Sequence, residues 1–249
     1  MYISYSLWGS NEVYTYGMIE NVLLAKEIYK GWKVRIHYND TVPIKVIEWL
    51  GTQDNVMMIH HEGSGTVASN MFWRFYDLFI PNTVVLIRDA DSRLSLHEKD
   101  MVDEWLNSSK DFHVIRGHPH HKVPILGGTC GCRNNLLEYI HVSSGTNSIN
   151  ASPRSFIMGG SFLNLYIDKL PAEKNRYNAD QKFLYHYVYP IVASSLFVHS
   201  VKDNTYEPFA KIIETRDTGF VGDIVTECPF ASQIMGDERT VFIREPAYT

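Results

Sequence analysis

The sequence predicts an α/β fold in which helices cover both faces of a mostly parallel β-sheet. Short, β-rich apolar runs alternate with segments of helical spacing along roughly the first 90 residues. One run, residues 83–87, is apolar or β-branched at every position, which is typical of a strand buried on both faces. The chain has 249 residues, of which 45% are hydrophobic, so it is long enough for a substantial core. Because no linker, repeat or low-complexity tract interrupts it, we expect a single domain over residues 1–249.

The first half of the chain alternates between expected strands and expected helices. We expect strands over residues 2–8, 33–38, 56–60 and 83–87. Apolar side chains recur at helical spacing over residues 16–29, 43–50 and 68–80. Gly31 follows the first of these helices and Pro43 begins the second, as is usual for the ends and first turns of helices. This alternation predicts right-handed crossovers and parallel strand pairing.

The second half of the chain is less regular. A helix is expected over residues 96–107, with Ser95 as its N-cap and Glu98 as the capping-box partner. The other expected elements are a helix over 178–189, strands over 112–115 and 196–201, loops over 118–133 and 147–155, and strand-and-turn fragments from 202 onward, ending in the run 240–244.

Composition excludes several classes of protein. The formal net charge is −5 without a basic block, which disfavours nucleic-acid binding. The three cysteines, Cys130, Cys132 and Cys228, do not form a disulfide framework, so a reducing compartment is expected. The first residues lack the charged and apolar regions of a signal peptide, and no apolar run is long enough for a transmembrane helix. We therefore expect a cytoplasmic protein without a transmembrane segment.

An acidic pair, Asp89 and Asp91, follows the buried strand 83–87 directly. In sheets of this kind ligands bind beyond the carboxyl ends of the strands. Two carboxylates one residue apart can face a hard cation such as Mg²⁺ or Mn²⁺, which in proteins usually bridges carboxylates to substrate phosphates. The alternative is that both residues only form a turn or a cap, because short motifs of this kind also arise by chance. The buried strand directly before the pair favours the metal site.

The segment IRDADSRLSLHEKDMVDEWLNSSKDFHVIRGHP resembles the core of small GT-A glycosyltransferases of viral and bacterial type. The resemblance continues in SYSLWGSNEVYTYGMIENVLLAKEIYKGW, in PILGGTCG and in ADQKFL, and leaves the last ~50 residues unmatched. It implies a Rossmann-like GT-A fold with a nucleotide-binding half up to about residue 95 and an acceptor or sugar half after it. It also implies an enzyme that uses Mn²⁺ or Mg²⁺ to transfer a sugar from a nucleotide sugar, with UDP as the expected nucleotide, to a glycan hydroxyl.

The same resemblance implies a role for particular residues around the cation. Asp89 and Asp91 correspond to its carboxylate ligands, and His199, in FVHS, corresponds to a histidine that serves as third ligand. His199 is equally compatible with a core or surface histidine. Lys202 could contact a phosphate as a point charge, although its spacing departs from the family pattern.

The nucleotide-sugar donor is expected at the carboxyl ends of strands in the first half of the chain. Leu7 and Trp8 end the first strand, where the base and ribose are expected, although Trp8 could equally pack against a helix. Arg74 lies on an otherwise aromatic helix face, so it needs a partner: the diphosphate, a carboxylate of the acidic pair, or solvent. The further donor-binding candidates are Asp40 at the end of the second strand, Arg88 and Ala90 in the sequence RDADSR (residues 88–93), and Gly128.

Asp180 and Gln181 match a pair found at the sugar end of related sites. Asp180 could be a general base for the acceptor hydroxyl, a helix cap, or both. Gln181 would bind sugar hydroxyls or the acceptor. Gly127 and Gly128 allow the backbone to approach a ligand closely and so could form the floor of the sugar pocket.

The sequence bears on three other interpretations. The histidines and cysteines between His113 and Cys132 do not have the spacing of a zinc site. A nucleotidyltransferase would carry a basic, glycine-rich loop after the first strand, whereas SLWGSNEVY contains no Lys or Arg. A catalytically inactive module that binds nucleotide sugars or glycans remains the non-enzymatic alternative.

Overall fold

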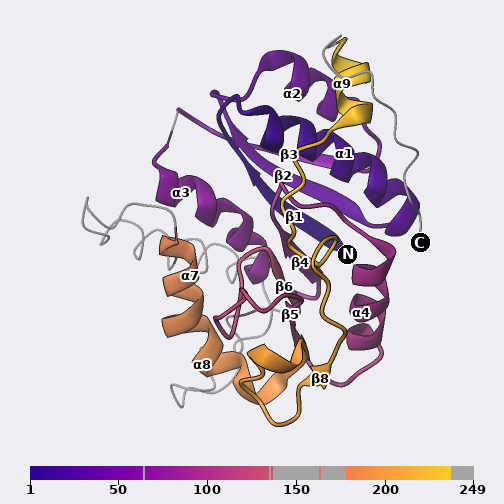
Figure 1. Ribbon diagram of the computed structural model, residues 1–249. Helices are drawn as coiled ribbons and strands as arrows, with labels where there is room; N and C mark the ends of the chain where they lie inside the picture. Colours follow the sequence, from indigo (N-terminus) through magenta and orange to yellow (C-terminus); the bar gives the residue numbers. More distant parts are fainter. Residues whose placement is uncertain (64, 135, 137–162, 164–177, 237–249) are drawn as a thin grey trace.

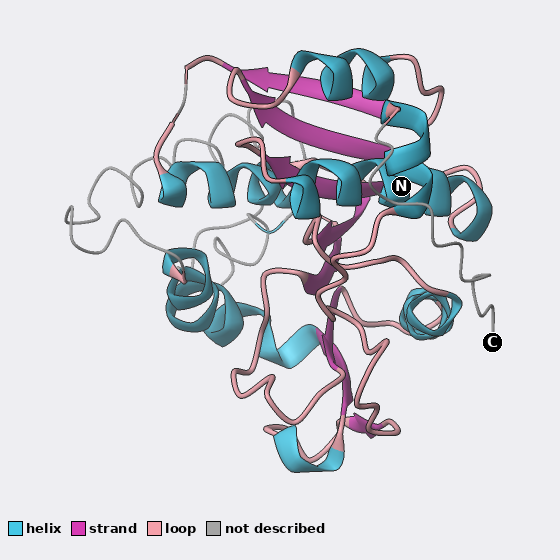
Figure 2. Cartoon of the chain, turned by 45° about the horizontal axis from the view of Figure 1, so that its top comes forward, coloured by secondary structure: helices cyan, strands magenta, loops and turns pink. Residues whose placement is uncertain are grey.

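The computed structural model describes residues 1–63, 65–134, 136, 163 and 178–236. It confirms the mostly parallel α/β fold: the described strands form one sheet in the order β3-β2-β1-β4-β6-β5-β7-β8 (Figure 1, Figure 2). The pairs β4–β6 and β5–β6 are antiparallel and the other five pairs are parallel. The strands are β1 (Tyr2–Leu7), β2 (Lys33–Asn39), β3 (Val56–His61), β4 (Val84–Arg88), β5 (Phe112–Arg116), β6 (Thr129–Arg133), β7 (Leu196–Ser200) and β8 (Lys211–Ile212).

Helices cover both faces of this sheet, and each face has its own apolar core. One face carries α1 (Glu12–Ile28), α2 (Ile44–Gly51), α4 (Leu96–Leu106) and α9 (Pro229–Met235). The other face carries α3 (Val67–Phe72), the 3-10 helix η1 (Trp73–Phe79), α7 (Ala179–Phe183), a π-helical turn (Leu184–Val188) and α8 (Tyr189–Val192). Side chains of β4 alternate between the two cores, with Leu86 in the first and Val85 and Ile87 in the second.

Two helix starts show how local sequence sets these elements. The first helix begins at Glu12, four residues before the predicted start, because the Asn11 side chain accepts a hydrogen bond from Val13 N at 3.0 Å. Ser95 caps α4 as predicted, with its hydroxyl accepting from Glu98 N at 3.1 Å. The Glu98 carboxylate does not complete the predicted capping box; it turns inward and accepts from Arg88 Nε at 2.8 Å.

Several predicted boundaries were wrong. The helix expected over residues 68–80 is α3 followed by the 3-10 helix η1. The expected loop 118–133 contains the antiparallel strand β6, whose central Gly131 leaves room for Leu86 and Trp105: a Cβ there would lie 2.9 Å from Leu86 Cδ2 and 3.1 Å from Trp105 Cζ3.

The end of the chain also departs from the prediction, because α9 forms where only strand-and-turn fragments were expected. The expected loop 147–155 and the run 240–244 lie outside the described residues. In the part of the chain that the structure describes, every helix is too short or too polar to cross a membrane.

Candidate active site

The acidic pair lies at the carboxyl end of β4, where the order in which strands are added to the sheet reverses. The chain runs outward through β1, β2 and β3 and then returns to place β4 on the other side of β1. Such a switch point is the usual ligand site of a doubly wound sheet. Asp89 and Asp91 are the first and third residues after β4, so the fold brings them to the expected position.

Helix α1 fixes the backbone of the loop between β4 and α4, which carries Asp89 and Asp91 and which we call the acidic loop. The Asn21 side chain donates to Ser92 O at 2.8 Å and accepts from Leu94 N at 3.0 Å. One turn earlier, Gly17 leaves room for the loop: a Cβ there would lie 2.8 Å from Arg93 Nη1 and closer still to the Ala90 carbonyl oxygen. Asn21 lies between the apolar residues Ile19 and Val22 on the buried side of the helix, and it was not predicted as a site residue.

A segment near the end of the chain, residues 225–228, covers the other side of the loop. Val225 N donates to Asp91 O at 2.8 Å. The Arg93 guanidinium donates to Val225 O and to Cys228 Sγ, both at 3.0 Å. This covering segment follows the part of the chain that resembles the glycosyltransferases, so no motif indicated it.

Arg74, on η1, joins the acidic loop to α7. Its Nη1 forms an ion pair with Asp89 Oδ1, and its Nη2 lies 3.0 Å from Asp180 Oδ2. The side chains of Arg74 and Asp180 are only 7% and 4% exposed, whereas that of Asp89 is 41% exposed. Burial disfavours the charged guanidinium, but the two carboxylates outweigh burial and raise the pKa of Arg74. The partner of Arg74 is therefore a carboxylate of the acidic pair, together with Asp180.

Gly127 and Gly128 close the site from the side of β6. A Cβ on Gly128 would lie 2.6 Å from Asp89 Cγ, so only glycine fits against this carboxylate. A Cβ on Gly127 would lie 2.9 Å from Arg74 Nη2, 3.0 Å from Gln181 Nε2 and 3.1 Å from Asp180 Oδ2. The glycine pair thus packs directly on the charged side chains of the site.

The site carries more negative than positive charge. Burial and the neighbouring Asp89 raise the pKa of Asp91 to about 6, and burial also raises the pKa of Asp180. Arg74 contacts two of these three carboxylates, so a hard cation would relieve the remaining repulsion. Among the described residues no group of three His, Cys, Asp or Glu side chains could hold a metal ion. A pair of carboxylates is a typical protein contribution to a hard divalent cation, which in proteins usually takes further ligands from phosphate oxygens and water.

His199 does not join the acidic pair, which corrects its prediction as third metal ligand. Val198 points into the core beneath η1 and α7, so the next side chain along β7 points to the opposite face. There His199 is fully buried, with Nε2 3.0 Å from Glu104 Oε2 of α4 and Nδ1 2.9 Å from His113 Nε2.

Three of the predicted donor-binding side chains belong to the core. Arg88 is buried on the α4 face, where its guanidinium forms an ion pair with Glu98. The Leu7 side chain is fully buried beneath α1, and that of Ala90 packs into the same core. The exposed Lys202 lies in a 3-10 turn (Lys202–Asn204) after β7, and no interaction in the described part of the chain joins it to Asp89 or Asp91.

Trp8 and Asp40 lie at the carboxyl ends of β1 and β2, as predicted. Trp8 is half-buried and packs against the core on the η1 side. Asp40 is exposed, and it accepts from His60 Nε2 at 2.7 Å and from Gly63 N at 2.8 Å. The hydrogen bond from His60 lowers the pKa of Asp40.

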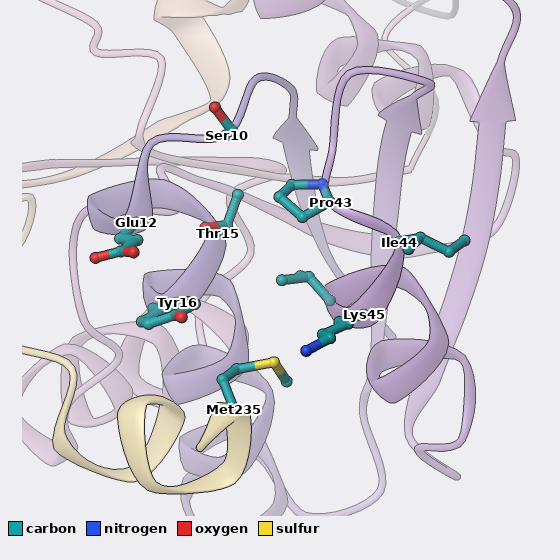
Figure 3. A pocket seen from close by; sticks show the side chains of 9 residues that line it. Ser10, Glu12, Thr15, Tyr16, Pro43, Ile44, Lys45 and Met235 are labelled. Atoms are coloured by element: carbon teal, nitrogen blue, oxygen red, sulfur yellow. The ribbon is translucent and has the colours of Figure 1, made fainter. Parts of the chain in front are cut away.

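A pocket of about 230 Å³ lies on the α1 face of the same sheet edge (Figure 3). It is enclosed by the N-terminal turns of α1 and α2 and by the end of α9. Its lining residues are Ser10, Glu12, Thr15, Tyr16, Pro43, Ile44, Lys45, Val46 and Met235. None of the charged residues around Arg74 contributes to it.

No family model and no curated protein matches this sequence. Among solved structures, the chain is similar to a mannosyltransferase, PcManGT, from Pyrobaculum calidifontis in complex with GDP-Man and Mn²⁺. The match has a TM-score of 0.43 and 14% sequence identity, and it covers 56% of this chain and 46% of the other. This chain therefore spans about half the length of this solved structure.

Proposed function

We propose that the protein is a metal-dependent glycosyltransferase that transfers a sugar from a nucleoside diphosphate sugar, with UDP as the nucleotide, to a hydroxyl group of a glycan. The observation that carries this proposal is the contact of Arg74 with both Asp89 and Asp180 at the switch point of the sheet, with Asp91 two residues after Asp89 in the same loop. A carboxylate pair for a cation, a buried guanidinium and a further buried carboxylate are the groups that such a transfer needs.

In this proposal Asp89 and Asp91 hold Mn²⁺ or Mg²⁺, and Trp8 and Asp40 contact the nucleoside. The bound cation supplies Lewis-acid stabilisation of the negative charge that develops on the diphosphate as it leaves. Arg74 keeps the carboxylates of Asp89 and Asp180 in fixed positions, since it binds both through separate nitrogens.

Asp180 acts as the general base. The acceptor oxygen forms a bond to the anomeric carbon, the bond from that carbon to the diphosphate oxygen breaks, and the nucleoside diphosphate departs with the electron pair. The proton of the acceptor hydroxyl passes to Asp180. Burial favours this role because it raises the pKa of the carboxyl and so makes its anion a stronger base.

The test is release of nucleoside diphosphate from a panel of UDP- and GDP-sugars, with Mn²⁺, with Mg²⁺ and with EDTA. We expect turnover that EDTA abolishes and that Asp91→Ala lowers by about 100-fold or more, as is common when a charge that stabilises the transition state is removed. Asp100→Ala, which removes an exposed carboxylate of α4, serves as the control and should retain full activity.

Two results would contradict the proposal. Turnover that survives EDTA, or that Asp91→Ala leaves unchanged, would remove the metal role. Tight binding of UDP and Mn²⁺ by calorimetry, without turnover of any donor, would identify a nucleotide-sugar-binding module in place of an enzyme.

A further inference from the structure

A second pocket, of about 440 Å³, opens between the loop before β6 and helix α7. We call it the lysine pocket; its lining residues are His120, Lys122, Val123, Leu126, Asn178, Gln181, Lys182 and Tyr185. This volume is within the range of small-molecule sites in proteins. The lysine pocket shares no lining residue with the pocket of Figure 3.

The lysine pocket adjoins the proposed general base. Leu126 precedes Gly127, and Gln181 follows Asp180. A Cβ at Gly127 would lie 3.0 Å from Gln181 Nε2 and 3.1 Å from Asp180 Oδ2, so these groups form one wall. The Gln181 Oε1 atom is buried and has no hydrogen-bond partner within the described structure, which leaves it able to accept from a ligand hydroxyl.

The described lining of the lysine pocket carries positive charge. Lys122 and Lys182 line it together with His120, and none of the described lining residues is acidic. In the described part of the chain neither ammonium group forms a salt bridge, although the protein as a whole has a formal net charge of −5. Two unpaired cations beside one cavity attract anions, because a cleft with charges of one sign concentrates counter-ions.

The aromatic part of the lining suits a sugar ring. Tyr185 is 47% exposed at the pocket, so its ring offers a flat, amphipathic surface. The amide of Gln181 and that of Asn178 add hydrogen-bonding groups for hydroxyls. The lysine pocket thus combines an aromatic surface on which a sugar ring can stack, amides that can bind sugar hydroxyls, and ammonium groups that can bind an anionic group.

We propose that the lysine pocket binds the acceptor and that the acceptor is a sugar bearing an anionic group, a carboxylate or a phosphate. This inference rests on the proposed function, because it assumes that the acceptor hydroxyl must reach Asp180. Lys122 and Lys182 bind the anionic group, and Gln181 holds the acceptor against the wall shared with Asp180.

The experiment is an NMR titration of the full chain, without divalent cation and at constant ionic strength, with glucuronate, glucose 6-phosphate, glucose and inorganic phosphate. We expect both anionic sugars to bind with a roughly tenfold lower Kd than glucose, as two solvent-exposed charge contacts would give. The double variant Lys122→Gln/Lys182→Gln should lose this preference. The control Lys30→Gln/Lys45→Gln removes the same charge from two exposed lysines elsewhere and should keep it.

Three results would overturn the inference: equal affinity for glucose and glucuronate, an equal loss of preference in the control variant, or inorganic phosphate binding as tightly as glucose 6-phosphate. A separate titration with UDP and Mn²⁺ tests the proposed function alone, since no contact joins either lysine to Asp89 or Asp91 within the described structure. Binding of UDP without a preference for anionic sugars overturns only the anionic acceptor, whereas absence of UDP binding overturns the proposed UDP-dependent transferase.

Discussion

A single methyl group at Gly128 tests whether the position of Asp89 matters for activity. In Gly128→Ala the new Cβ would lie 2.6 Å from Asp89 Cγ, whereas carbon atoms in contact normally lie about 3.5–4.0 Å apart. The carboxylate must therefore move by about 1 Å, and a misplacement of this size can cost about 100-fold in rate. Asp89 is 41% exposed and can turn toward solvent, so we expect the free energy of unfolding to fall by no more than about 1–3 kcal/mol.

Two measurements on Gly128→Ala separate these effects: release of nucleoside diphosphate with Mn²⁺, and urea unfolding. We expect the rate to fall about 100-fold while the variant remains folded. Gly51→Ala is the matched control, because a Cβ at Gly51 meets no atom within 4 Å; it should keep full activity. Wild-type turnover and Mn²⁺ affinity in Gly128→Ala would refute the claim that Asp89 holds the cation in the observed position.

Two further predictions concern buried charges outside the site. Glu98→Gln leaves the Arg88 guanidinium buried without its carboxylate, so urea unfolding should show a loss of about 3–5 kcal/mol, while a loss below about 1 kcal/mol would refute this pairing. Burial alone would raise the pKa of Asp77, but His37 and Arg35 outweigh burial and hold this pKa below its ordinary value. Its ion pairs therefore stabilise the fold above about pH 4 and lose this contribution as the pH falls through the lowered native pKa. The stability difference between wild type and Asp77→Asn should shrink on acidification in that range, and a difference independent of pH would contradict the assignment.

Much of the site could be predicted because its residues follow local rules. Asp89 and Asp91 come directly after an apolar run, and the carboxyl end of such a strand is where ligands bind in a parallel sheet. Arg74 needed a partner because a guanidinium among aromatic residues cannot stay unpaired, and the fold supplies Asp89 and Asp180.

The failures concern which face of the sheet a side chain occupies. His199 and Arg88 both follow residues that point toward η1 and α7, and both turn to α4 instead. Motif spacing does not tell which face of the sheet a side chain occupies, because a shift of one residue along a strand moves the side chain to the other face. The strand β6 was missed for a related reason: its sequence, TCGCR, is short and contains glycine, and only the pairing with β4 and β5 stabilises it.

The alternation of strands and helices, the buried strand β4 and the acidic pair after it could be predicted from the residues alone, because periodicity and residue type act over a few neighbouring positions. Which charged side chains contact one another could be read only from the folded chain. Asp180 reaches Arg74 from 106 residues away, and residues 225–228 reach the acidic loop from more than 130 residues away. Contacts over such separations depend on how the sheet is ordered and on which helices cover each face, and no local pattern in the chain specifies either.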